Sequence, residues 1–321
     1  MSLSLWLPVG GFIFGGYFLQ HVCKQSARAA QLRLRGLAHV RGLRRLLEAL
    51  PAHRGMANAL LQGDASFRDK LAAQGRKIDG DMALLKDMIA GGDPWGVAER
   101  AARIADQWSS IQRDLGGLRS RDSFARHTDL IAELLYLMHD TARAAGLLDA
   151  ADATTSRLAD AAVNHLPLVT EMLGQARGVG TGVAAKGKCG TAMRVKLSYL
   201  LQKVRAVAEE VSQVTARVLA ADAAFKAKAK HALAESQAAQ TRFLDLLEGR
   251  IINSREVSIP PGEYFAAGTQ AVERSFVLLD NLFAAMQARL ERDAQESARR
   301  LWFARGGAIA ACLPLLFFFV A

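Results

Sequence analysis

The chain has little proline and few aromatic residues, which narrows the fold classes open to it. Only 7 of its 321 residues are proline, and aromatic residues make up 7%. Alanine, leucine, arginine, glutamine and glutamate are abundant instead, and these residues favour helices. Half of the chain (51%) is apolar and 22% is charged, as in an ordinary folded protein, so the composition argues against intrinsic disorder. It predicts an all-α protein.

Cysteine is also scarce, and the groups that would hold a metal or carry out catalysis are not clustered. Cys23 and Cys312 lie in apolar stretches near the two ends, and Cys189 lies in a glycine-rich loop. This spacing fits neither a disulfide framework nor a metal site. The stretch 182–189 nearly matches a phosphate-binding loop, but Cys189 stands where that motif needs a hydroxyl, so an interhelical loop is expected. We expect no metal, no cofactor, no catalytic residue and no enzyme activity.

Two segments lack charge altogether, one at each end. Residues 3–23 carry no formal charge, and about 20 such residues cross a bilayer as a helix. A cleaved signal peptide would have its basic residues before the apolar stretch, whereas here they follow it. We predict an N-terminal transmembrane anchor over 1–23, a helical body over 24–305, and a C-terminal hydrophobic, membrane-inserted segment over 306–321.

Acidic residues are missing from the segment that follows the first apolar stretch. The net charge is +10, and seven cations with no acid lie between Lys24 and Arg45. A basic excess beside an apolar segment is typical of a membrane flank, so no nucleic-acid partner is expected. Arginines flank the body on both sides, which favours a cytoplasmic body. Long segments are translocated regardless of charge, so the side of the membrane stays open.

The body contains about eight expected helices, separated by Gly-, Pro- and Asp-containing breaks. Their expected ranges are 27–62, 66–90, 95–116, 122–146, 152–185, 191–220, 223–253 and 261–304. Asp93 is expected to cap the third helix, with Pro94 as its first residue. The last helix carries an apolar stripe at alternating spacings of four and three residues. The stripe is Val272, Phe276, Leu279, Phe283, Met286 and Leu290. Eight helices in this order predict two stacked four-helix bundles flanked by the terminal membrane segments.

Two arginines interrupt apolar stripes of the same kind. Arg54 follows a stripe formed by Leu43, Leu47 and Leu50, and Arg177 occupies the matching place in a short repeat 123 residues later. Small residues follow each arginine. A buried guanidinium needs an anion.

One interpretation is that each arginine pairs with a carboxylate such as Glu133 or Glu171, or extends to water. In the other, Arg54 and Arg177 converge on a flat oxyanion such as nitrate, which matches the planar fork of a guanidinium. Both remain open, as does whether a third arginine such as Arg242 joins the site.

Four segments resemble one known family. They are LLEALPAHRGMANALLQGDASFRDK (46–70), SFARHTDLIAELLYLMHDTARAAG (123–146), LPLVTEMLGQARGVGTG (166–182), and Tyr264-Phe265 with Thr269. Together they resemble the nitrate- and nitrite-sensing (NIT) domain over roughly residues 40 to 300. This family occurs in chemoreceptors, kinases and RNA-binding antiterminators. The resemblance implies two four-helix bundles, a nitrate or nitrite ligand, anion contacts from Arg54 and Arg177, and a homodimer.

These observations predict a membrane-anchored signal-transduction sensor of the bacterial inner (cytoplasmic) membrane, acting on an unidentified downstream signalling protein. The alternative is a membrane-tethered helical scaffold that does not sense, or the remnant of a truncated chemoreceptor. It arises because no signalling-output segment follows Arg305.

Overall fold

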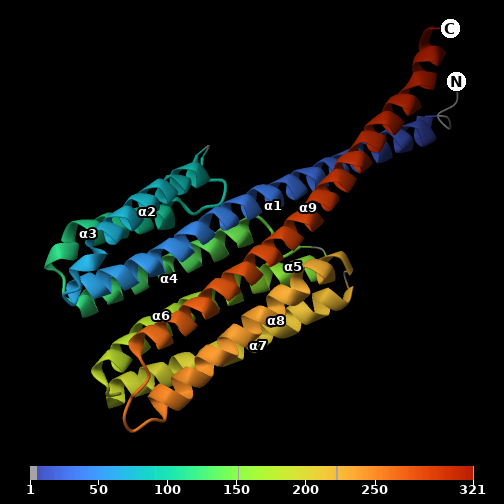
Figure 1. The fold of residues 1–321 in the computed structure, drawn as a ribbon. Helices are drawn as coiled ribbons and strands as arrows, with labels where there is room; N and C mark the ends of the chain where they lie inside the picture. Colours follow the sequence, from blue (N-terminus) through green and yellow to red (C-terminus); the bar gives the residue numbers. More distant parts are fainter. Residues whose placement is uncertain (1–5, 91, 151, 222, 321) are drawn as a thin grey trace.

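The computed structural model describes residues 6–90, 92–150, 152–221 and 223–320, and every regular element in these ranges is helical (Figure 1). The α-helices are α1 (Trp6–Leu61), α2 (Arg68–Ile89), α3 (Ala98–Asp114), α4 (Ser120–Ala144), α5 (Ala153–Asp160), α6 (Leu166–Lys186), α7 (Thr191–Ala221), α8 (Ala223–Leu246) and α9 (Pro261–Val320). A π-helical segment, Ala161–His165, joins α5 to α6 in one continuous rod, and a second, Leu247–Ile252, extends α8. The all-α prediction is confirmed, and these rods follow the expected ranges closely.

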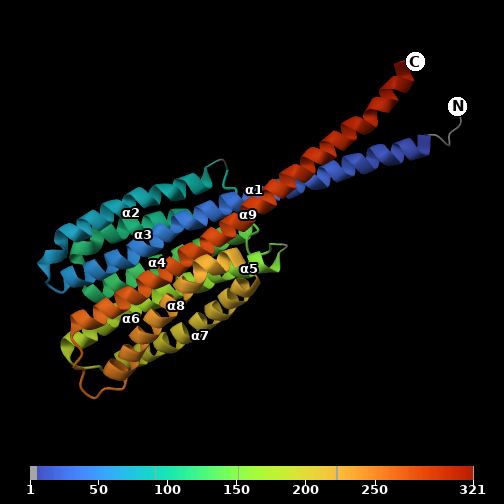
Figure 2. The ribbon, with the colours of Figure 1, turned by 45° about the vertical axis from the view of Figure 1, so that its right-hand side comes forward.

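The helices form two four-helix groups that lie side by side (Figures 1 and 2). Helices α1 to α4 make up the first bundle, and α6 to α9 make up the second. The bundles meet mainly where α1 packs along α9. Arg44 of α1 stabilises this contact, because its guanidinium donates to Asp280 at 2.9 Å and lies 4.7 Å from the centre of the Phe276 ring. The contact between α1 and α9 therefore joins the two bundles.

The apolar stripe predicted for the last helix lies in the hydrophobic core. Phe276, Leu279, Phe283, Met286 and Leu290 are all buried along α9, and Val272 is half-buried. Spacings of four and three residues keep these side chains on one face of the helix. The stripe was therefore interpreted correctly.

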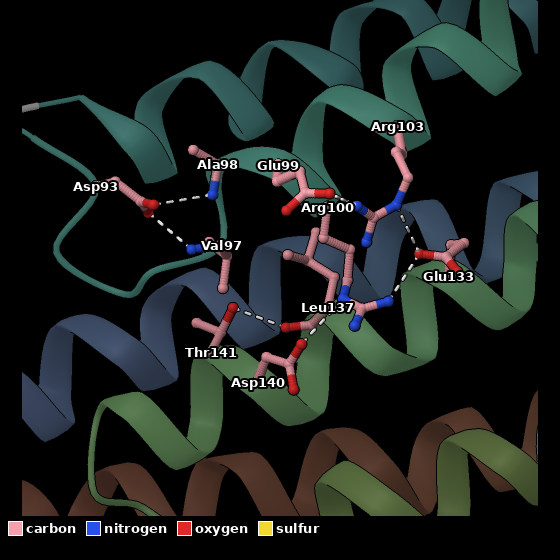
Figure 3. A network of polar contacts seen from close by, with 10 residues as sticks. All are labelled: Asp93, Val97, Ala98, Glu99, Arg100, Arg103, Glu133, Leu137, Asp140 and Thr141. Atoms are coloured by element: carbon pink, nitrogen blue, oxygen red, sulfur yellow. Dashed lines mark hydrogen bonds and ion pairs between the residues drawn. The ribbon is translucent and has the colours of Figure 1, made fainter.

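The start of α3 differs from the prediction. Asp93 has a positive φ of 54°, and its carboxylate accepts hydrogen bonds from the backbone N–H groups of Val97 (2.8 Å) and Ala98 (3.0 Å). Asp93 does cap α3, but from a loop, since the helix begins at Ala98 (Figure 3). The prediction that Pro94 is its first residue is wrong. The intervening turn lets Asp93 reach the free N–H groups from outside the helix.

Ion pairs attach α3 to α4. Arg100 donates to Glu133 at 2.7 Å and to Asp140 at 2.9 Å. Arg103 pairs with Glu99 on its own helix and also approaches Glu133 at 3.7 Å. Figure 3 shows both arginines reaching from α3 toward Glu133 on α4. Glu133 is therefore engaged with α3.

Helices α1 and α9 continue beyond the bundles and project from the same end of the molecule (Figures 1 and 2). We call these projecting parts, before Ala30 in α1 and after Ala294 in α9, the stalk. Within the described residues no helix has a stretch long and apolar enough to cross a membrane. The predicted membrane segments, 1–23 and 306–321, fall mostly on residues whose side chains lie outside the described part of the chain.

Candidate functional site

Arg54 is buried where the two bundles meet. It continues the stripe of Leu43, Leu47 and Leu50 on α1, and its side chain is only 2% exposed. The guanidinium forms a two-pronged ion pair with Glu171 of α6, with Nη1–Oε1 at 2.5 Å and Nη2–Oε2 at 3.1 Å. The Glu171 side chain is 5% exposed. Such a fork-to-fork pair is the strongest geometry that arginine offers to a planar anion.

Two residues of α4 complete the surroundings of Arg54. Its Nη1 also donates to the Thr128 hydroxyl at 3.0 Å, and its guanidinium carbon lies 4.7 Å from the centre of the Phe124 ring. Opposite them, α6 carries glycines. A Cβ on Gly174 would lie 3.5 Å from Nη2 of Arg54, and one on Gly178 would lie 3.3 Å from the Phe124 ring. The absence of these side chains lets α6 approach α1 and α4.

Arg177 lies on α6 and faces α9. Its Nη1 donates to the Thr269 hydroxyl at 3.0 Å, and its guanidinium carbon lies 4.9 Å from the centre of the Phe265 ring. A Cβ on Gly268 would come within 2.9 Å of the Arg177 side chain, so this glycine makes room for it. Among the described residues no carboxylate lies within 4.0 Å of the Arg177 guanidinium. Arg177 is thus a half-buried cation held by neutral groups.

The electrostatic environment of Arg177 is unfavourable for its charge. Burial lowers its pKa and the positive charge of Arg54 lowers it further, while Glu273 and Glu171 act in the opposite direction. A guanidinium does not lose its proton in a protein. The lowered pKa therefore expresses a free-energy cost of holding this charge, and a nearby anion would relieve that cost.

Lys196 of α7 is a further cation at this place, and sequence reasoning missed it. Its Nζ lies 5.3 Å from the centre of the Phe124 ring, which the guanidinium of Arg54 also contacts. Burial lowers its pKa and Arg54 lowers it further, whereas Glu171 raises it. The described part of the chain supplies no carboxylate within 4.0 Å of Nζ. Lys196 flanks an apolar stripe on α7, and such lysines are usually solvated, so the sequence carried no signal for it.

A buried histidine pair adjoins Arg54. Nδ1 of His127 donates to the Ser123 carbonyl oxygen at 2.7 Å. In the neutral ring Nε2 then carries no proton, so it accepts a hydrogen bond from Nδ1 of His53, 2.8 Å away. Burial lowers the pKa of His53 to about 3, with a contribution from His127. Burial also lowers the pKa of His127 to about 4, and Arg54 lowers it further. Both rings are therefore neutral at physiological pH.

The structure treats the candidate arginines differently. Arg54 forms an ion pair with Glu171, as one of the two interpretations anticipated. Glu133 instead forms an ion pair with Arg100 of α3. Arg54 and Arg177 lie close enough for the charge of one to act on the other, but each has its own hydrogen-bond partners. Arg242 is exposed and donates to Gln270 at 3.2 Å, one residue after the Thr269 that Arg177 binds.

The near phosphate-binding stretch 182–189 covers the last residues of α6 and the start of the expected interhelical loop. Helix α6 continues to Lys186, and Gly187 ends it with a left-handed φ of 65°. This conformation suits glycine at a helix C-terminus. An α-helix precedes the loop rather than the β-strand that a phosphate-binding loop follows.

Comparison with known proteins agrees with this architecture. Residues 45–294 match the family described as nitrate and nitrite sensing, NIT. The fold is similar to the structure of the NasR transcription antiterminator, with a TM-score of 0.62 and 14% sequence identity over 96% of this chain and 86% of that one. At this identity the likeness shows the fold alone. No curated protein matches the chain in sequence. A sensing family points to a non-catalytic sensor, and by the extent of the match this chain belongs to the NIT family.

Proposed function

We propose that this protein is a membrane-anchored signal-transduction sensor that binds nitrate or nitrite through Arg54 and Arg177. Family membership supports the ligand class. The observation that supports the site most strongly is the arrangement of charge. Arg177 and Lys196 are partly buried cations without an ion-pair partner among the described residues, and the positive charge of Arg54 lowers the pKa of both. A small planar oxyanion supplies the negative charge that this place lacks.

The proposed signal is a shift of helices. Arg54 belongs to α1 in the first bundle and Arg177 to α6 in the second, so an anion that both arginines bind draws the bundles together. Without it, repulsion between the two cations opposes that approach. The anion therefore binds one arrangement better than the other, which is the requirement for shifting a conformational equilibrium.

The proposed setting is the bacterial inner membrane. The anchors would be residues 1–23 and 306–321, with the sensor domain of residues 24–305 between them, working as a homodimer on a downstream signalling protein. The exposed Trp302, three residues after Arg299, and the exposed Tyr17, two helical turns before Lys24, support this setting, since aromatic residues and cations are enriched at membrane interfaces.

Calorimetric titration of the full-length protein in detergent with nitrate and with nitrite tests the proposal. Arg177→Ala should weaken binding by roughly 10-fold to 100-fold, because hydrogen bonds to charged groups contribute about 1.5–3 kcal/mol. Arg113→Ala, at an arginine of α3 whose side chain is 73% exposed, should bind as the wild type does. Wild-type affinity in Arg177→Ala would contradict the site assignment.

A second candidate is the non-sensing tethered scaffold, and one observation favours it: Arg54 is already neutralised by Glu171. The same titration separates the two. A folded protein that shows neither heat nor a thermal shift with nitrate and nitrite would be a scaffold.

A further inference from the structure

The fork of Arg54 is already occupied by an anion that belongs to the protein itself. The Glu171 carboxylate is planar, and its two oxygens meet the two terminal nitrogens of the guanidinium. Nitrate and nitrite are planar too and present neighbouring oxygens in the same way. The same pair of N–H groups cannot serve both anions, so an oxyanion that uses this fork has to replace the carboxylate.

We propose that Glu171 is a built-in competitor for the ligand: it holds Arg54 in the ligand-free protein, and the incoming oxyanion displaces it. The inference rests on the proposed function and adds to it a residue that sets affinity and is released on binding.

The site offers the displaced carboxylate another partner. Glu171 raises the pKa of Lys196, so the two charges already attract each other although they are not in contact. Lys196 is partly buried and has no ion-pair partner among the described residues. Gln175, one turn along α6, donates to Oε1 of Glu171 at 2.8 Å and can remain bound during a small rotation of that side chain. Displacement therefore exchanges one buried ion pair for two and leaves neither carboxylate nor guanidinium unpaired.

Displacement also changes a contact between the two bundles. The Arg54–Glu171 pair joins α1 of the first bundle to α6 of the second. Displacement exchanges this direct tie, which we call the latch, for one through the anion that Arg54 shares with Arg177 of α6. The exchange acts on α1, whose N-terminal part forms one arm of the stalk. The ligand thus releases the latch and joins the bundles through a different contact.

The decisive variant is Glu171→Gln, which keeps the shape of the side chain and removes its charge. In calorimetric titrations of the full-length protein in detergent, this variant should bind nitrate at least 10-fold more tightly than the wild type. Glu273→Gln is the matched control, because Glu273 also acts electrostatically on Arg177 but forms no ion pair with Arg54. It should change the affinity by much less than Glu171→Gln does.

A second readout follows the latch itself. Spin labels at the exposed positions Lys77 on α2 and Gln202 on α7, in a background without native cysteines, report the distance between the bundles. Nitrate should shift this distance in the wild type, and Glu171→Gln, which lacks the latch, should differ from the wild type in this distance without nitrate. An unshifted distance in the variant overturns the latch.

The outcomes separate the two proposals. Affinity in folded Glu171→Gln that is unchanged or weaker than in the wild type overturns the inference, while the sensor function stands if the wild type binds. If neither protein binds nitrate or nitrite, both proposals fail. Should Glu171→Gln not fold, Glu171→Asp replaces it, since a shorter carboxylate reaches Arg54 less well. It too should bind nitrate more tightly, and unchanged or weaker binding would again refute the competitor.

Discussion

The buried pair of His53 and His127 should make the fold sensitive to mild acid. With pKa values of about 3 and about 4 in the folded protein, neither ring accepts a proton at pH 5. In the unfolded chain both have a pKa near 6.5 and are protonated at pH 5. Because the unfolded state binds more protons, the free energy of unfolding falls as the pH drops below about 6.5.

The size of this effect follows from the unfolded pKa. At pH 5, about 1.5 pH units below 6.5, each histidine costs about 2 kcal/mol, at 1.36 kcal/mol per unit. The two together cost about 4 kcal/mol, a large part of the 5–15 kcal/mol that typically stabilises a folded protein. The geometry gives a reason for His127: a proton on its Nε2 would face the Nδ1–H group of His53 across a 2.8 Å contact. For His53 the main cause is burial.

Equilibrium unfolding in urea, followed by circular dichroism at pH 7.5, 6.5, 5.5 and 5.0, measures this loss. The double variant His53→Gln/His127→Gln should lose most of the pH dependence in this range. His231→Gln, at a ring that is 82% exposed, should retain it. The reasoning is refuted if wild-type stability is the same at pH 7.5 and pH 5.0, or if the double variant declines as steeply as the wild type.

Three further predictions concern packing, capping and ion pairing, each measured as a thermal or urea unfolding midpoint. Gly180→Ala should lower the free energy of unfolding by about 1–3 kcal/mol, because the new Cβ would lie 2.3 Å from the Tyr264 hydroxyl. Gly182→Ala, which has open space around its Cβ, should raise the free energy of unfolding by about 0.5–1 kcal/mol through its higher helix propensity. Equal effects of the two would contradict the packing. Asp93→Ala should cost about 1 kcal/mol as a lost cap, and no change would mean that the cap does not stabilise α3. Arg100→Ala should cost no more than about 1 kcal/mol, since its pairs are partly solvated, and a larger loss would show that they act as a buried network.

The sequence predicted the helices well because their apolar spacing reflects burial directly. Phe276 and Phe283 are buried on α9 as their period required. Local chemistry was less readable: Asp93 caps α3 from a loop with a left-handed backbone, a geometry that the pair Asp93-Pro94 does not specify. The π-helical segment between α5 and α6 likewise left no recognisable pattern.

The candidate site was predictable only in part. The stripe on α1 placed Arg54 in the interior, which the structure confirms. The stripe does not show whether the anion that pairs with Arg54 is a carboxylate of the protein or a ligand. Glu171 is 117 residues away and contacts Arg54 only because α6 packs on α1. The contribution of Lys196 depends in the same way on α7 meeting α4. Such partners are set by tertiary packing rather than by local spacing.

The stalk makes the molecule a lever. At 1.5 Å per residue, its two arms, residues 6–29 of α1 and 295–320 of α9, are each roughly 35–40 Å long. A tilt of about 5° at the base of such an arm moves its far end by about 3 Å. A side-chain rearrangement between the bundles that tilts an arm by this amount would therefore move the end of the arm by about the width of an atom. The length of the arm alone produces this amplification.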